Sequence, residues 1–218
     1  MKIRINKVHF PVEVLGPGRR LGIWLQGCSL ACKGCCSRDT WVADAGSEMD
    51  ISALLDLCRE MTDLPFHGVT VSGGEPFEQP VALHELLLAL PELSNERSEQ
   101  FDVLVYSGFS KSLLERKFPE TLKLIDVLIP GPYVEKRTGS SVLAGSDNQV
   151  PRFANEVVQE RYEEWMSNQS ATTSRKLQAT VDEAGIWLIG LPRRGDLEKM
   201  ERQCLKEGLE FNSPSWRC

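Results

Sequence analysis

Four of the seven cysteines in this chain lie in one short segment, and that segment is the part of the sequence best suited to chemistry. Cys28, Cys32 and Cys35 follow the spacing C-x3-C-x2-C. One loop with this spacing can place three thiolates on one face of a four-iron cluster. The cysteine count is odd and the N-terminus has no apolar signal region, which together argue against a disulfide framework and favour a metal site.

Two alternatives for these thiols stay open on the residues alone. They could bind zinc with a fourth partner, or they could be free thiols. Structural zinc prefers paired C-x2-C knuckles, so the spacing favours an iron–sulfur cluster over zinc. Cys36 also leaves the register open, because Cys28, Cys32 and Cys36 would follow the spacing C-x3-C-x3-C.

Three protein ligands leave one iron of such a cluster without a thiolate. An open coordination position is what a catalytic metal site needs. An α-amino acid can chelate that iron through its amine and carboxylate, and a low-potential cluster can pass one electron to a sulfonium held close by. For S-adenosylmethionine (SAM), the products of that step are methionine and a 5′-deoxyadenosyl radical, which abstracts hydrogen atoms.

Strand-like and helix-like segments alternate along most of the chain. Apolar runs predict strands near residues 2–6, 21–26, 69–71, 102–106 and 124–129, and helical spacing predicts helices after Asp50, over 83–90 and over 110–118. This alternation is typical of βαβ units around a parallel sheet, in which the chemistry lies at the C-terminal ends of the strands. The motifs that follow strands are therefore expected to meet at one rim: Gly27-Cys28, Ser72–Pro76, Ser107–Phe109 and Gly131–Tyr133.

The last part of the chain has a different pattern. Residues 167–176 are polar and rich in Ser and Thr, and we expect a linker or mobile loop there. Residues 185–191 predict a strand, apolar spacing from Leu197 to Leu205 predicts a helix, and Gly208 would end it. We therefore expect a core at residues 1–160 and, at 161–218, an extension with one further strand–helix–strand unit.

The order of these motifs resembles the radical SAM superfamily, and more closely the activating proteins of anaerobic (class III) ribonucleotide reductase. The resemblance covers roughly residues 8–155. It rests on five stretches, which are, in chain order, Gly16-Pro17-Gly18-Arg19, Cys28-x3-Cys32-x-Gly34-Cys35 with Asp39-Thr40-Trp41, Ser72-Gly73-Gly74-Glu75-Pro76, Ile125–Ile129 followed by Gly131 and Tyr133, and Gly145-Ser146-Asp147-Asn148-Gln149. The resemblance implies an α/β fold of the partial, open (β/α) barrel type, a [4Fe-4S] cluster on Cys28, Cys32 and Cys35, and SAM as its second cofactor.

The same resemblance implies partners. A large glycyl-radical enzyme would receive the radical on a glycine, and flavodoxin or ferredoxin would donate the electron. Two alternatives are kept: a radical SAM enzyme that modifies a small molecule, nucleotide or peptide directly, and a zinc-binding interaction module. The added C-terminal unit favours the first alternative because it could cover the site, whereas the Gly-Gly-Glu-Pro element has no purpose in a zinc module.

In the family that this sequence resembles, the Gly-Gly-acid-Pro element holds the amino group of SAM. On that basis we predict that Ser72, Gly73, Gly74 and Glu75 bind the cofactor, with Glu75 accepting a charge-assisted hydrogen bond. The structural alternative for the glycines is a tight turn after a strand. The alternative for Glu75 is an acid placed favourably at the N-terminus of a helix.

Four further residues complete the predicted cofactor site. Gly34 and Cys36 belong to the cysteine loop, Ser107 follows a predicted strand, and Asn148 lies in the last stretch of the resemblance. A simple turn is the structural alternative for Ser107, and a solvated loop is the alternative for Asn148.

The composition is that of a globular protein with an acidic balance. Of the residues, 41% are hydrophobic and 26% are charged, and the formal net charge is −6. This balance argues mildly against nucleic acid as the main partner. The most apolar stretch, residues 81–90, contains His84 and Glu85 and is shorter than the roughly 20 residues of a membrane helix. We expect a cytoplasmic protein that does not associate with membranes.

Overall fold

The computed structural model describes residues 1–62, 64–93, 101–170, 176–182, 185–212, 214 and 216. Its main sheet has seven strands in the order β3-β1-β2-β4-β5-β6-β7, and a separate sheet pairs β8 with β9. The strands of the main sheet are β1 (Lys2–Val12), β2 (Arg20–Leu25), β3 (Glu48–Asp50), β4 (Gly68–Gly73), β5 (Asp102–Ser107), β6 (Val127–Pro130) and β7 (Arg152–Phe153).

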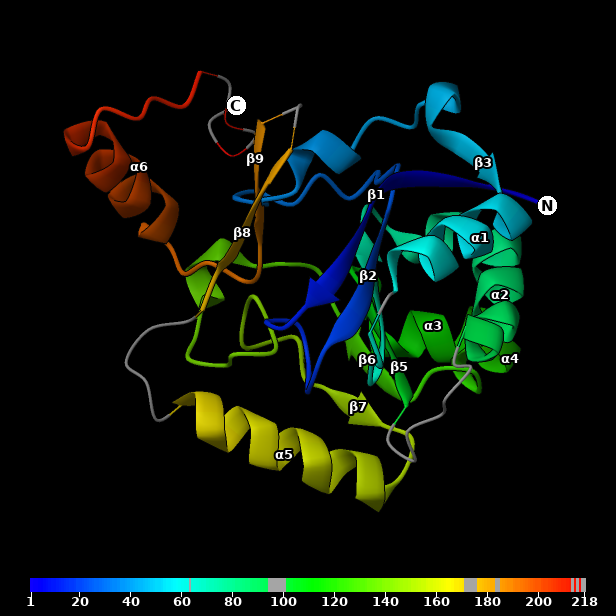
Figure 1. Cartoon of the computed structure of the whole chain (residues 1–218). Helices are drawn as coiled ribbons and strands as arrows, with labels where there is room; N and C mark the ends of the chain where they lie inside the picture. The colour runs from blue at the N-terminus through cyan, green and yellow to red at the C-terminus, as the bar shows by residue number, and fades with distance from the viewer. Residues whose placement is uncertain are drawn as a thin grey trace.

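The helices lie on both sides of this sheet. Figure 1 shows α1 to α4 gathered on one side, with β8, β9 and α6 on the opposite side. The α-helices are α1 (Ile51–Met61), α2 (Pro80–Ala89), α3 (Lys111–Lys117), α4 (Pro119–Leu122), α5 (Glu156–Ser170) and α6 (Asp196–Lys206). The predicted alternation of strands and helices is confirmed from β2 to β6, so the chain has an α/β fold.

The centre of the main sheet is parallel and its edges are antiparallel. β2, β4, β5 and β6 run in the same direction. β1 is antiparallel to β2 and to β3, and β7 is antiparallel to β6. Because four neighbouring strands are parallel, their C-terminal ends form one edge, and the segments that follow them lie together there.

The two faces of the sheet bury different partners. Along β5, Val103 and Val105 face the cluster of apolar side chains from α1 and α2, and Leu104 between them joins a second cluster with Tyr162 of α5. This follows from the period of two in a strand, which sends successive side chains to opposite faces. A third cluster packs Ile189 of β9 against Val12 and Trp24 of the main sheet.

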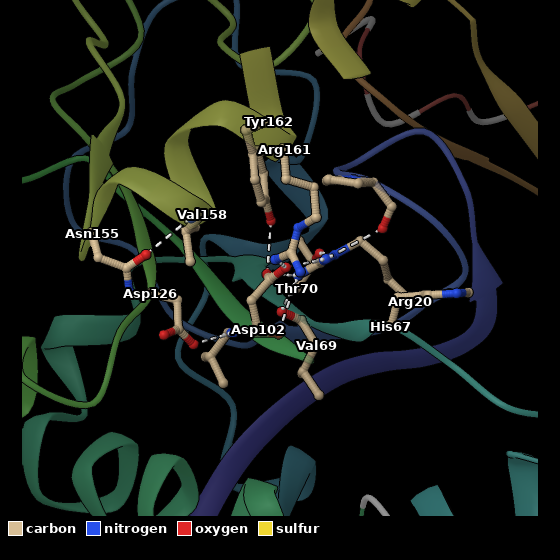
Figure 2. A network of polar contacts seen from close by, with 12 residues as sticks. Arg20, His67, Val69, Thr70, Asp102, Asp126, Asn155, Val158, Arg161 and Tyr162 are labelled. Carbon is tan, nitrogen blue, oxygen red and sulfur yellow. Dashed lines mark hydrogen bonds and ion pairs between the residues drawn. The ribbon is translucent and has the colours of Figure 1, made fainter. Parts of the chain in front are cut away.

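A network of buried charges joins α5 to the N-terminal ends of the central strands (Figure 2). Nη2 of Arg20 lies 2.6 Å from Oδ1 of Asp102, and the two side chains are 0% and 1% exposed. The Tyr162 hydroxyl donates to the same carboxylate at 2.7 Å, Arg161 pairs with it as well, and Nε of Arg20 donates to Oγ1 of Thr70 at 2.7 Å. A buried charge is tolerated only when its partners satisfy it, so these residues hold one another in place.

The C-terminal region differs from the expected strand–helix–strand unit. The prediction was wrong in the order of elements: β8 (Gln178–Asp182) and β9 (Gly185–Ile189) form an antiparallel pair, and α6 follows them. β8 alternates polar and apolar residues, but Ala179 and Val181 alone make this a short signal after a Ser- and Thr-rich stretch. Its place depends on contacts distant in sequence, since the side-chain amide of Gln178 donates to the carbonyl oxygen of Pro11 at 2.6 Å. We call the described residues from Gln178 onward, which include β8, β9 and α6, the C-terminal unit.

The expected division between core and extension falls inside a helix. Residue 160 lies in α5, which continues to Ser170, so the first part of the predicted linker at 167–176 is helical. Residues 171–175 of that linker lie outside the described residues. Among the described residues, no helix combines the length and the apolar character needed to cross a membrane.

We expect Asp102→Asn to lower the free energy of unfolding by about 3–5 kcal/mol, because it leaves the Arg20 guanidinium buried without a countercharge. Urea unfolding followed by circular dichroism measures this. The matched control is Glu120→Gln, which breaks an exposed pair with Lys123 and should change stability by less than about 1 kcal/mol. Equal stability of the two variants would contradict the role given to the network.

Candidate active site

The cysteine loop is closed at its base by main-chain hydrogen bonds. The amide of Gly27 donates to the carbonyl of Thr40 at 2.7 Å, and the amide of Cys28 donates to the carbonyl of Trp41 at 3.0 Å. The side-chain amide of Gln26 donates to the carbonyl of Val42 at 2.6 Å. The loop therefore leaves β2 and returns to the same place, which explains why it has no helical or strand period.

The Gly-Gly-Glu-Pro element is attached to the base of this loop. The Gly74 amide donates to Leu25 O at 2.8 Å, and the Glu75 amide donates to Gly27 O at 2.9 Å. A Cβ atom on Gly74 would lie 2.2 Å from Gly27 O, and one on Gly73, which has a φ of +96°, would lie 2.5 Å from the amide nitrogen of Leu25. The glycines are thus required by the close approach of two main chains, in addition to any contact with a ligand.

Glu78 also holds the cysteine loop, a role that no sequence pattern indicated. Its Oε1 accepts a hydrogen bond from the Ser29 amide at 2.9 Å and another from the Ser29 hydroxyl. This contact joins the turn after Glu75 to the residue next to Cys28. The spacing between Glu75 and Glu78 is not a known ligand pattern, so only the folded chain reveals the contact.

Three donors hold the Glu75 carboxylate, which is 1% exposed. Oε1 accepts from the Phe77 amide at 3.0 Å and from the Ser107 hydroxyl at 2.9 Å, and Oε2 accepts from the Gly108 amide at 2.6 Å. Burial raises the pKa of Glu75 to about 7, although these hydrogen bonds partly offset the effect. A carboxylate offers about four acceptor positions, so one stays available for a further donor such as an ammonium group.

The cysteine loop and the ends of β4 and β5 line one cavity of about 170 Å³. The structure brings almost all of the predicted site residues to it. The predicted residues that line this cavity, called here the cofactor cavity, are Cys28, Cys32, Gly34, Cys35, Cys36, Ser72, Gly73, Gly74, Glu75 and Ser107. Their roles as ligands of a cluster or of SAM stay predictions.

The thiols around this cavity differ in their surroundings. The sulfur of Cys35 accepts a hydrogen bond from the Ser37 amide at 3.4 Å, an arrangement that suits a cluster thiolate. Burial raises the pKa of the Cys28 thiol and of the Cys35 thiol, and backbone N–H groups partly offset both increases. Burial raises the pKa of Cys36 to about 11, with the neighbouring Cys35 adding to it.

The donor set fits a four-iron cluster. Among the described residues, no three His, Cys, Asp or Glu side chains converge on a point where they could hold a single metal ion. A four-iron cluster bonds each thiolate to a different iron, so its ligands need only surround one space. Cys28, Cys32 and Cys35 do this: they lie on one loop, are partly exposed and line the same cavity.

Asn148 is the predicted site residue that this cavity does not include. Its side-chain amide donates to the carbonyl of Pro132 at 2.7 Å, so it supports the loop after β6. The neighbouring Gln149 lines the cavity instead. Gly131 and Tyr133, from a motif expected at this rim, also line the cavity. The prediction missed Tyr106, which the alternation along β5 could have placed on this side, as well as Leu191 and Pro192.

Comparisons with known proteins show what this chain is similar to. Residues 14–151 match the family described as a 4Fe-4S single cluster domain. The anaerobic ribonucleoside-triphosphate reductase-activating protein of Haemophilus influenzae is 30% identical over 146 residues, which are 65% of this chain and 93% of that protein. The protein of the same name from Enterobacteria phage T4 is 29% identical over 136 residues, which are 62% of this chain and 85% of the phage protein. QueE from Escherichia coli aligns with a TM-score of 0.41 and 19% identity over 50% of this chain and 54% of the QueE chain.

We expect Gly74→Ala to lower the free energy of unfolding by about 1–3 kcal/mol and to reduce the iron bound after reconstitution, because its Cβ would push the cysteine loop from β4. Chemical unfolding and iron analysis measure the two effects. Gly46→Ala is the matched control, because neither glycine has a left-handed backbone and the nearest atom at Gly46 belongs to the flexible Asp44 side chain, at 3.3 Å. The argument fails if both variants bind iron as the wild type does.

We expect the stability of the cofactor-free protein to fall as pH rises from about 4.5 to about 7 through the ionisation of Glu75. In this window Glu75 of the folded protein keeps its proton, because the pKa of Glu75 there is about 7. In the unfolded chain the same side chain has already lost its proton, because its ordinary pKa is 4.5. The resulting loss of stability is on the order of 3 kcal/mol and is complete above pH 7. Glu75→Gln should therefore match the wild type near pH 5 and exceed its stability at pH 8, as measured by unfolding across pH. Parallel pH profiles would contradict it.

Proposed function

This chain belongs to the family of 4Fe-4S single cluster domain proteins and is a radical SAM enzyme, and we propose that it installs a glycyl radical on an anaerobic ribonucleotide reductase. The observation that carries the proposal is the cofactor cavity, where Cys28, Cys32 and Cys35 face Glu75 across the ends of the parallel strands. The curated relatives match 62–65% of this chain and carry the activating protein's name.

Different residues of the cofactor cavity would hold the cluster and SAM. Cys28, Cys32 and Cys35 would bind three irons of the cluster. Glu75 would accept the ammonium of SAM at its remaining acceptor position, and Ser107 keeps the carboxylate aimed at the cavity by donating to it at 2.9 Å. The chemistry supplied when both cofactors are bound is one-electron cleavage of SAM to methionine and a radical that removes a hydrogen atom from a glycine Cα.

Other features of the proposal rest on the same resemblance. The partial, open (β/α) barrel is supported by four parallel strands and by the helices that cover one face of them. Flavodoxin or ferredoxin would supply the electron. The division into a core at 1–160 and an extension at 161–218 is part of the proposal as well, with α5 spanning the division.

A second function is favoured by one observation. Leu191 and Pro192 of the C-terminal unit line the cofactor cavity, although they lie beyond residue 151, where the family match ends. A unit that covers the site could shape it for a small molecule, nucleotide or peptide that is modified directly. Transfer of deuterium from such a substrate into 5′-deoxyadenosine would support this alternative.

Anaerobic reconstitution with iron and sulfide tests the proposed function. We expect the wild type, given SAM and dithionite, to produce 5′-deoxyadenosine, and we expect Cys32→Ala to bind little iron and produce none. Cys204→Ser is the matched control, since this cysteine lies on α6, away from the loop, and should leave both measurements unchanged. Cys35→Ser should lose the cluster and Cys36→Ser should keep it; the opposite result would place the third ligand at Cys36.

The partner is tested separately with a candidate anaerobic ribonucleotide reductase. We expect a glycyl EPR signal on the reductase only when this protein, SAM and reductant are all present. Production of 5′-deoxyadenosine without such a signal on any candidate reductase would overturn the proposed partner while leaving SAM cleavage established.

A further inference from the structure

A second cavity, of about 650 Å³, lies between the core and the C-terminal unit. The core contributes Lys7, Trp24 and Asp39 to its lining, and the C-terminal unit contributes Phe211 and Trp216 together with an unbroken run at residues 185–192. We call it the docking cavity. Residues that line both the docking cavity and the cofactor cavity are Cys36, Ser72, Tyr106, Leu191 and Pro192. The two cavities therefore adjoin, and a ligand in the second lies next to the predicted radical site.

The run of lining residues shows how β9 faces the docking cavity. Successive side chains of a strand point to opposite faces, so a cavity over one face is lined by every second residue. All residues of β9, Gly185 to Ile189, line this cavity, so it follows an edge of the strand. β9 pairs with β8 along its other edge, for example Trp187 with Thr180, and within the described part of the chain β8 is its one partner strand.

Side chains of β8 and β9 hold the strand pair against the core. The ring of Trp187 meets that of Trp24 edge to face with centroids 4.6 Å apart, and the Lys7 ammonium lies 4.9 Å from the Trp187 ring. Ile189 is 1% exposed. At β8, the side chain of Gln178 accepts a hydrogen bond from the Glu13 amide at 3.2 Å and so fastens the pair to the end of β1. The edge is therefore formed before any ligand arrives.

The shape of the docking cavity fits an extended peptide better than a compact molecule. Five residues of β9 extend over about 17 Å, at about 3.3 Å per residue, and the chain then enters the cofactor cavity at Leu191 and Pro192. An added strand gains its affinity from main-chain hydrogen bonds to such an edge. The rest of the lining includes both apolar and polar residues, Phe211, Trp216, Glu210 and Asn212 among them, which suits the alternating side chains of a strand.

We propose that β9 is a docking strand, which receives an extended peptide segment of the partner by strand addition and leads that segment into the cofactor cavity. This inference rests on the proposed function, because it states how the glycine-bearing segment of the reductase is held. The C-terminal unit then acts as a guide for a polypeptide, and its position over the site does not conflict with a protein substrate.

Backbone-modified peptides test this docking with the full-length protein. The probes are short synthetic peptides that span the radical-bearing glycine of the candidate reductase: one unmodified, one N-methylated at odd positions and one at even positions. In an antiparallel or parallel ladder only alternate amides of a strand face a given neighbour. We expect one methylated peptide to bind at least about tenfold more weakly than the unmodified peptide, and the other to bind within about twofold. Hydrogen exchange measured on the complex should slow at residues 185–190.

Each result bears on one proposal. Equal loss or equal retention of binding by the two methylated peptides, or slowed exchange elsewhere than in β9, would overturn strand addition. Failure of every peptide to bind would overturn it too and would leave the docking cavity to a small substrate. If the intact reductase shows a glycyl EPR signal, the proposed function is retained whatever the peptides do. If one methylated peptide binds weakly and the other normally but no EPR signal appears, only the docking strand is retained.

Discussion

The contact between the main chains at Gly27 and Gly74 is the constraint on which the site depends. With 2.2 Å between the position of a Gly74 Cβ and Gly27 O, no side chain fits there, and the two segments touch through backbone alone. This contact sets the cysteine loop directly against the end of β4. Glu75 follows Gly74 and so reaches the same cavity as the thiols. The positions of the predicted cluster ligands and of Glu75 therefore depend on one steric condition.

The two ends of the parallel strands have opposite properties. At the N-terminal ends, the buried charges of Arg20 and Asp102 are satisfied by Tyr162, Thr70 and each other, which binds α5 firmly to the sheet. At the C-terminal ends the strands open into cavities lined by loops. A fold of this kind keeps its stability and its chemistry at separate edges, so loops at the site can change without loss of the sheet.

The C-terminal unit lies outside the family match, which ends at residue 151, yet it contributes to the site. α5 carries the chain back across the sheet from β7, and β9 returns to the rim where Pro192 lines the cofactor cavity. The unit is fixed to the core by Trp187, Ile189 and Gln178. It is therefore a fixed wall of the site, and part of the docking cavity is built from residues beyond the family match.

Local sequence determined much of this protein. The spacing of Cys28, Cys32 and Cys35 depends on a single loop, and the alternation from β2 to β6 depends on short-range apolar periods, so both could be predicted without a structure. The convergence of the Gly73–Gly74–Glu75 turn with the cysteine loop followed from the rule that parallel strands end at one edge.

Only the tertiary structure decided the remaining features, because each depends on partners distant in sequence. Glu78 became a support of the cysteine loop through its contact with Ser29. The side-chain amide of Asn148 donates to the carbonyl of Pro132, and Asn148 does not line the cofactor cavity. The order of β8, β9 and α6 could not be read from periods, since β8 offers only the short alternation of Ala179 and Val181 and is held by pairing and by Gln178. Short-range pattern specifies which element forms, whereas packing and hydrogen bonding between distant segments decide which side chains meet.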